Sequence, residues 1–276
     1  MTTARDSWEL PITEGQLARL TREMESAHRE TLPAMRAGAV DLAEEVHERG
    51  ARSGDGPLDA GRRRFLAGAG GLAAALALAA CSSSDKNTSS SVKGVGAAST
   101  SPSSSGGSTY TGDLKIVALA VALENQAVGA YQSTLTAAKA GTLGTVPPAV
   151  TSFVTTAMAQ HADHAKVWNA VLTGAGKPAI TNVPLSNQPA TLAALNKATT
   201  VADIAKLALQ LENQAAQTYL FATFNVKSAA GIATAATIAP VEAMHAAILH
   251  FVLGQYPVPD DFLPTDKAAS PALLTV

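Results

Sequence analysis

LENQAVGAY at residues 123–131 recurs in nearly the same form as LENQAAQTY at residues 211–219. Each copy places a glutamate, Glu124 or Glu212, among small and apolar residues with helical periodicity. A carboxylate on the buried face of a helix costs free energy unless another group compensates its charge. The repeat therefore raises the question of what compensates two buried charges.

Composition limits the function classes that need consideration. The chain has 276 residues and a net charge of −2, which fits one or two domains and gives no reason to expect nucleic-acid binding. Aromatic residues are few, and the single cysteine, Cys81, excludes an internal disulfide.

Composition also divides the chain into segments. They are an N-terminal leader at 1–60, a signal at 61–81, a Ser/Gly-rich tether at 82–112, a helical domain at 113–258 and a C-terminal tail at 259–276. The tether has too little apolar surface to fold by itself, and we expect it to hold the domain away from a membrane.

The signal segment resembles an export signal. Arg62 and Arg63 begin the run RRRFL, which resembles the twin-arginine pattern, although Gly61 stands where Ser or Thr is usual. The apolar run at 65–80 is short for a transmembrane helix. We therefore expect export by the twin-arginine machinery.

The signal ends in LAAC at residues 78–81, which resembles the lipobox of bacterial lipoproteins. In such proteins the cysteine receives lipid and becomes the mature N-terminus. The resemblance implies a protein anchored through Cys81 on the outer face of the cell membrane. The alternative is a free, buried cysteine.

The leader has a pattern of its own. Residues 13–46 could form a charged amphipathic helix. Its apolar stripe would consist of Leu17, Leu20, Met24, Leu32, Met35 and Leu42. The leader could be a cytoplasmic extension that is cut away, or it could result from a start codon assigned too early. The sequence indicates no function for it.

Periodicity predicts four long helices in the helical domain, at about 114–140, 148–173, 201–224 and 229–254. The Pro147-Pro148 pair and the capping-box pattern from Thr200 to Asp203 mark two helix starts, and Pro240 predicts a kink or break. A long connection with one short helix near 190–197 separates the second and third helices. This arrangement predicts an all-α, ferritin-like four-helix bundle with a long crossover.

Glutamate is rare in the domain, and its placement is the most informative feature. After Cys81 the chain has only three glutamates, Glu124, Glu212 and Glu242, and all three fall on apolar helix stripes. Soluble helices ordinarily carry glutamate on their surfaces. We therefore expect three carboxylates in the core.

The third glutamate belongs to a Glu-x-x-His motif, Glu242 to His245, whose i, i+3 spacing places both side chains on one helix face. Di-iron carboxylate bundles use a Glu from each of two helices and a Glu-x-x-His from each of the other two. The second helix offers His161 and His164 at the same spacing, with His161 where a glutamate is expected. Aligning the two halves pairs His161 with Glu242 and His164 with His245.

On these motifs, residues 113–258 resemble the ferritin-like superfamily. They resemble more narrowly the exported bacterial ferritin-like proteins related to plant desiccation-induced proteins. The closest match is IAPVEAMHA at residues 238–246, with Met244 in place of a common arginine. The resemblance implies two metal ions, usually iron, that react with oxygen or peroxide. The narrower group has no settled activity to carry over.

Six residues are therefore candidate ligands of a divalent metal. Iron is the metal we expect, with manganese or zinc as alternatives. The six residues are Glu124, His161, His164, Glu212, Glu242 and His245. An imidazole does not bridge two metals as a carboxylate does, so His161 leaves open whether one or two ions bind. Asp163 lies off the face and does not replace the missing glutamate.

A buried hydrogen-bond network without metal is the alternative for these residues. In that case protons would have to neutralise the cluster, and we expect raised carboxyl pKa values and a cost in stability near neutral pH. Tyr131 and Tyr219 are expected to be core tyrosines hydrogen-bonded to ligands. We expect Trp168 in the core and a structural role for His250.

Two function classes follow. One is a membrane-anchored, metal-dependent redox protein, such as a ferroxidase or a peroxide-consuming oxidoreductase. The other is a non-catalytic envelope or stress-related lipoprotein with a vestigial or structural metal site. The sequence decides neither turnover, nor substrate, nor oligomeric state.

Overall fold

The structure, a computed structural model, describes residues 10–52, 109–258 and 264–276. Of these, residues 10–48, 109–258 and 264–276 belong to one compact unit. Arg62, Arg63, Cys81 and most of the predicted tether lie outside the described residues. Every regular element within the described residues is helical, which confirms the predicted all-α class.

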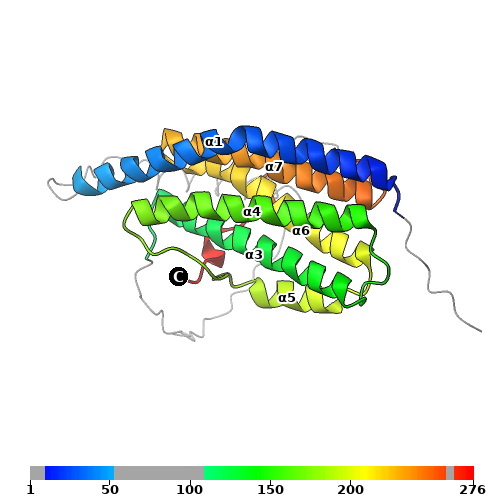
Figure 1. Cartoon of the computed structure of the whole chain (residues 1–276). Coiled ribbons are helices and arrows are strands. Elements are labelled where there is room, and N and C mark those ends of the chain that lie inside the picture. Colours follow the sequence, from blue (N-terminus) through cyan, green and yellow to red (C-terminus); the bar gives the residue numbers. More distant parts are fainter. Residues whose placement is uncertain (1–9, 53–108, 259–263) are drawn as a thin grey trace, which may run out of the picture. The chain divides into compact units, whose positions relative to one another are not determined.

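Four long helices form the bundle and pair as two hairpins (Figure 1). The first hairpin is α3 (Asp113–Lys139) with α4 (Pro148–Gly174), and the second is α6 (Val201–Asn225) with α7 (Ala229–Val252). The crossover between them contains the short helix α5 (Gln188–Lys197). All four long helices begin and end within two residues of the predicted positions.

Local chemistry explains these boundaries. Pro148 opens α4, where its missing N–H removes no helical hydrogen bond. Thr200 caps α6 by accepting the N–H of Asp203, whose carboxylate accepts the N–H of Thr200, both at 3.1 Å. Gly141, at φ 72°, adopts the left-handed conformation that follows the end of α3.

The sequence predicts a kink or break at Pro240, and helix α7 continues through this residue without a break. The proline removes one backbone hydrogen bond. Ile238 and Val241 on either side are buried in the core, and their packing holds the helix together across that position.

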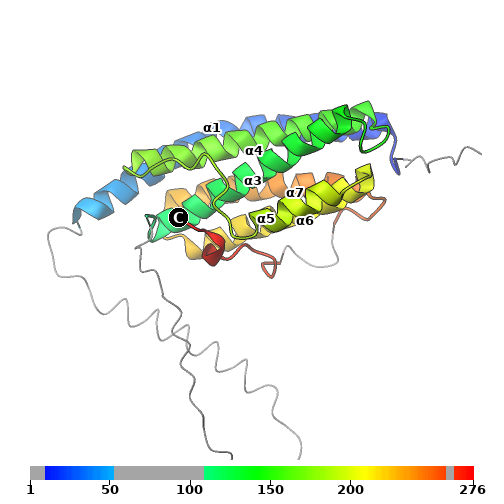
Figure 2. The same cartoon turned by 90° about the horizontal axis from the view of Figure 1, so that it is seen from below.

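A further long helix, α1 (Glu14–Arg52), lies along α4 and α7 (Figures 1 and 2). Its predicted apolar stripe faces the bundle, with Leu17, Met24, Met35 and Leu42 buried in the same clusters as bundle residues. Pro33 lies inside α1 but on the side of the helix that faces solvent, where it is tolerated. The leader segment therefore belongs to the fold of the unit, a role that its sequence did not indicate.

Small residues allow α1 to approach its neighbours closely. A Cβ at Gly38 would overlap Oγ1 of Thr234 on α7, and a Cβ at Gly174 on α4 would lie 2.8 Å from Cβ of Ala43. Without side chains at these points the helix backbones come closer than larger residues would permit.

The end of the chain also packs on the bundle. The Ala269 N–H donates to Oγ1 of Thr218 on α6 at 2.8 Å, and Ala269 is buried. Leu274, after the short 3-10 helix η1 (Pro271–Leu273), forms a β-bridge with Leu185 of the crossover. Residues 264–276 thus cover α3 and α6 on the side away from α1.

Among the described residues, α7 is the one helix long and apolar enough to cross a membrane by composition. Half of that stretch is buried inside the bundle, as in the core helix of a water-soluble domain.

The close contact of α1 with α7 can be tested at Gly38. Changing Gly38→Val should lower the free energy of unfolding by about 1–3 kcal/mol, because the new side chain would push α1 away from Thr234. The matched change Gly129→Val, on an exposed face of α3 with open space around it, should stay within about 0.5 kcal/mol. Urea unfolding of both variants measures the difference. Equal stabilities would show that α1 does not pack here in solution.

Candidate metal centre

Six buried side chains from the four bundle helices meet in the core. Helix α3 supplies Glu124, α4 supplies His161 and His164, α6 supplies Glu212, and α7 supplies Glu242 and His245. None of them exposes more than 2% of its surface. The structure thus brings together all the residues that the sequence singled out as candidate ligands.

Their nitrogen and oxygen atoms form two overlapping groups that could each hold a metal ion. One group is Glu124, His161, His164 and Glu242, and the other is His161, Glu212, Glu242 and His245. Within each group the atoms lie within 4.8 Å of one another. Because His161 and Glu242 belong to both groups, the two positions are adjacent.

His161 lies between the two groups. Its Nδ1 is 2.6 Å from Oε2 of Glu124, and its Nε2 is 3.1 Å from Oε1 of Glu212. Each ring nitrogen therefore meets a carboxylate from a different hairpin. A neutral imidazole has one lone pair, so it can ligate an ion on one side only.

Three atoms of the cluster lack ordinary hydrogen bonds, and they are Nδ1 and Nε2 of His164 and Oε1 of Glu242. Nδ1 of His164 and Oε1 of Glu242 lie 2.8 Å apart, yet neither has a hydrogen-bond partner of acceptable geometry among the described residues. Buried polar atoms are normally hydrogen-bonded, and such exceptions need an explanation. A nitrogen and an oxygen buried this close together without a hydrogen bond fit ligands of a shared cation, so the residues present suit a metal ion.

The tyrosines of the repeat cross between the hairpins. The Tyr131 hydroxyl on α3 donates to Glu212 on α6, and the Tyr219 hydroxyl on α6 donates to Glu124 on α3. The indole N–H of Trp168 donates to the Tyr219 oxygen at 2.9 Å. The expected hydrogen bonds from core tyrosines to candidate ligands are therefore present, as is the buried Trp168.

Two other expectations concern residues outside the cluster. Asp163 points away and pairs with Lys166 at 3.2 Å. His250 lies near the end of α7 and bonds to Oε1 of Gln255 at 2.8 Å.

Sequence reasoning missed three residues next to the cluster. Oε1 of Gln160 lies 2.8 Å from Nε2 of His245, and Nε2 of Gln160 donates to Glu25 of α1 at 2.8 Å. The ring of His28, also from α1, lies 5.2 Å from that of His164. His28 follows Met24 by four residues on the apolar stripe, and this spacing was the one available signal.

Protonated imidazoles compensate the carboxylates in the metal-free protein. Burial alone would lower the pKa of His164, but Glu124 and Glu242 raise it to about 9. Burial would likewise raise the pKa of Glu124, but His164 and His161 lower it to about 2. The expectation of raised carboxyl pKa values is therefore wrong for Glu124, because the protons reside on the histidines.

The neighbouring groups follow the same electrostatics. The pKa of Glu212 is lowered by His161 and His245 against the effect of burial, and the pKa of His161 is raised by Glu242 and Glu212. Burial and the charge of His164 lower the pKa of His28 to about 4. His28 is therefore uncharged at neutral pH.

The stability of the metal-free protein should therefore fall at alkaline pH. A histidine with a raised pKa stabilises the fold fully below its ordinary pKa of 6.5, and His164 loses this contribution as the pH rises to about 9. Melting temperatures in a chelator should fall between these pH values, and less so for His164→Gln. Bound metal should remove the fall, because it replaces the protons. A metal-free protein that becomes more stable over this range would contradict the assignment.

Comparisons with known proteins agree with this arrangement. The model of the ferritin-like domain family matches residues 112–255, which is just over half of the chain and includes all six cluster residues. Searches among curated proteins and among solved structures found no match. The chain belongs to the ferritin-like domain family.

Proposed function

We propose that the protein binds one or two divalent metal ions at the six-residue cluster. The proposed metal is iron, with manganese or zinc as alternatives. The observation that carries this proposal is the pair of overlapping ligand groups inside a closed core. Carboxylates and imidazoles suit these metals, and ferritin-like bundles bind them between facing helices.

We propose further that the site is an oxidoreductase centre of the ferroxidase or peroxide-consuming class. Iron, when bound, would supply electron transfer with oxygen, peroxide or ferrous iron. The protein's own contribution is to hold the ligands, to exclude bulk water by burial, and to place the Tyr131 and Tyr219 hydroxyls on Glu212 and Glu124.

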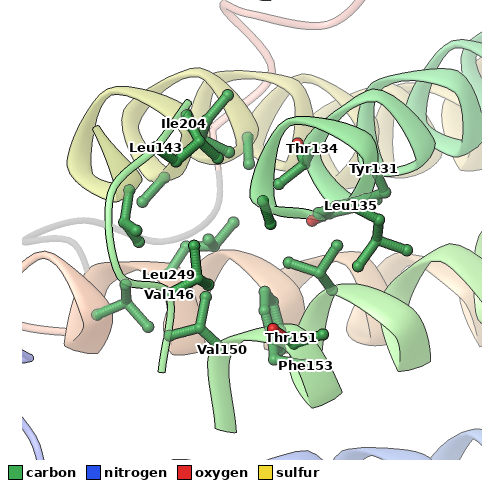
Figure 3. Close-up of a pocket in the computed structure, with 16 residues that line it drawn as sticks. Tyr131, Thr134, Leu135, Leu143, Val146, Val150, Thr151, Phe153, Ile204 and Leu249 are labelled. Carbon is green, nitrogen blue, oxygen red and sulfur yellow. The ribbon is translucent and has the colours of Figure 1, made fainter. Parts of the chain in front are cut away.

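A small apolar cavity beside the cluster supports this reaction class (Figure 3). Its volume is about 30 Å³, and Tyr131, Phe153, Leu143, Ile204 and Leu249 are among the residues that line it. About 10–15 Å³ suffices for a water molecule, so this cavity fits a molecule the size of dioxygen.

Two residues that line the cavity also contact candidate ligands. The Tyr131 ring stacks against His161 with centroids 5.7 Å apart, and the Phe153 ring meets His245 at 6.4 Å. A small apolar molecule in the cavity would therefore be separated from the cluster by these two aromatic rings.

A non-catalytic structural lipoprotein is the second candidate, and one observation favours it. Three carboxylates and three imidazoles compensate one another at hydrogen-bonding distances, such as the 2.6 Å between His161 and Glu124. Such a network could hold the helices together without metal.

Metal analysis tests metal binding against a network without metal. Protein purified from its native compartment should contain at least about one divalent ion per chain, and Fe(II), Mn(II) or Zn(II) should raise its melting temperature. The Glu242→Ala/His245→Ala variant should lose both the metal and the shift, because it removes a ligand shared by both groups and a ligand of the second. His250→Ala on the same helix, outside the cluster, is the control.

A metal content near zero, with no shift in melting temperature, would leave the structural candidate alone. The number of ions reports on His161. If one ion binds, His161→Glu should restore the second, because a carboxylate can bridge two metals where a neutral imidazole cannot.

We propose that the protein is exported by the twin-arginine machinery and anchored by lipid on Cys81 to the outer face of the cell membrane. The support is the sequence alone: the paired Arg62 and Arg63, the apolar run after them, and a cysteine where that run meets serines.

Cell fractionation tests the anchor. Cys81→Ala should move the protein from the membrane fraction to the soluble fraction, because a lipid chain provides the attachment. Replacing Arg62 and Arg63 by lysine should keep the protein in the cytoplasm. Unchanged membrane association of Cys81→Ala would refute the lipid anchor, and normal export of the lysine variant would refute the twin-arginine route.

A further inference from the structure

Two side chains of α1 are linked to the two histidines that end the i, i+3 motifs, one through another residue and one by a ring contact. Glu25 reaches His245 through Gln160, and His28 contacts His164. Both histidines direct Nδ1 at the carboxylates of the cluster, and Gln160 contacts the opposite nitrogen of His245, Nε2.

The contact through Gln160 fixes the orientation of an amide. The Glu25 carboxylate only accepts hydrogen bonds, so the amide NH2 of Gln160 faces it at 2.8 Å and the amide oxygen faces His245. Nε2 of His245 must then carry its proton and donate it at 2.8 Å. In the metal-free protein Nδ1 can then donate to Glu212 and Glu242, and loss of that proton would free its lone pair for an ion on the same side.

Glu25 is suited to this role because it remains ionised. Burial alone would raise its pKa, but the hydrogen bonds from Gln160 and Arg29 lower it below the ordinary value of 4.5. Gln160 is 1% exposed, so the relay runs through a buried amide that water does not reach.

The second contact concerns unpartnered nitrogens. Nε2 of His164 and Nε2 of His28 are both buried, and neither has a hydrogen-bond partner among the described residues. Their ring centroids lie 5.2 Å apart with the planes tilted by 60°. A neutral His28 has one acceptor nitrogen, and an Nε2–H on His164 is a donor of matching chemistry in the ring that His28 contacts.

We propose that α1 is a working part of the metal centre, in which Glu25, through Gln160, and His28 are positioning residues that hold His245 and His164 with Nδ1 toward the ion. This inference rests on the metal binding proposed above. Outer partners of this kind orient the ligand ring and raise its basicity, and losing one typically costs about 10–100-fold in metal affinity.

The test measures the affinity of the metal-depleted full-length chain for Co(II) or Zn(II) in competition with a chelator. Glu25→Gln should weaken binding about 10-fold or more, because a glutamine at position 25 can present either an oxygen or an amide to Gln160 and no longer fixes its orientation. His28→Phe keeps the ring volume and removes the acceptor, and it should weaken binding on a similar scale.

The chain offers a matched control for each change. Glu23→Gln breaks an i, i+4 contact with Arg19 that parallels the Glu25–Arg29 pair, but it lies on the exposed side of α1. His47→Phe changes an exposed histidine of the same helix. Both controls should bind metal as the unaltered chain does.

A coupling measurement distinguishes positioning from general loosening of the fold. If Glu25 acts through Gln160, the pair Glu25→Gln/Gln160→Leu should bind no more weakly than Gln160→Leu alone. The Co(II) absorption spectrum should also change in Glu25→Gln, since the ligand ring is reoriented. Fully additive losses with an unchanged spectrum would overturn the inference.

The outcomes separate this inference from the proposed function. If the unaltered chain binds no metal, metal binding fails and the role of α1 fails with it. If the unaltered chain binds metal and both α1 variants bind equally well, only the role of α1 is refuted.

Discussion

The burial of three carboxylates in one apolar core determines which other groups the unit must place beside them. Moving an isolated carboxylate from water into such a core costs a large free energy, so positive charge must accompany the three groups. The chain has no arginine after Arg64, and the cluster contains no lysine, so the charge comes from histidines or from metal. The lowered pKa of Glu124 and the raised pKa of His164 show the histidines taking this role in the metal-free protein. Protons and metal ions therefore compete for the same nitrogens, which couples metal binding to pH and to stability.

The repeat explains how one sequence builds such a site. Each hairpin gives a glutamate and a tyrosine on its first helix and an i, i+3 pair on its second. Tyr131 and Tyr219 each donate to the glutamate of the other hairpin, so each carboxylate has partners from both hairpins. The site thereby ties the hairpins together across the crossover. The one departure from symmetry is His161 opposite Glu242, and it converts a pair of bridging carboxylates into one carboxylate and one imidazole.

Sequence reasoning reached the bundle and the cluster because both depend on short-range spacing. Helix period, capping at Thr200 and the placement of Glu124, Glu212 and Glu242 are local patterns, and they predicted the helices and the converging residues. The role of α1 was not predictable in this way. An amphipathic stripe shows that a helix has a partner but not which surface it is, and the contact between Glu25 and Gln160 joins residues 135 positions apart. At Pro240 propensity predicted a kink or break, and the packing of Ile238 and Val241 keeps the helix continuous there.

The position of α1 constrains the anchor proposal. Cleavage before Cys81 would separate Glu25 and His28 covalently from the helices that carry the ligands, and it would leave Leu17, Met24, Met35 and Leu42 without a chain connection to the surface they cover. A processed lipoprotein would then have a centre without these outer partners unless the cleaved helix stayed bound. A chain that keeps α1 would have the complete centre but no lipid-bearing N-terminus at Cys81. Processing and metal affinity are therefore linked: if α1 supports the centre, metal should bind more tightly to the unprocessed chain than to a product that has lost α1.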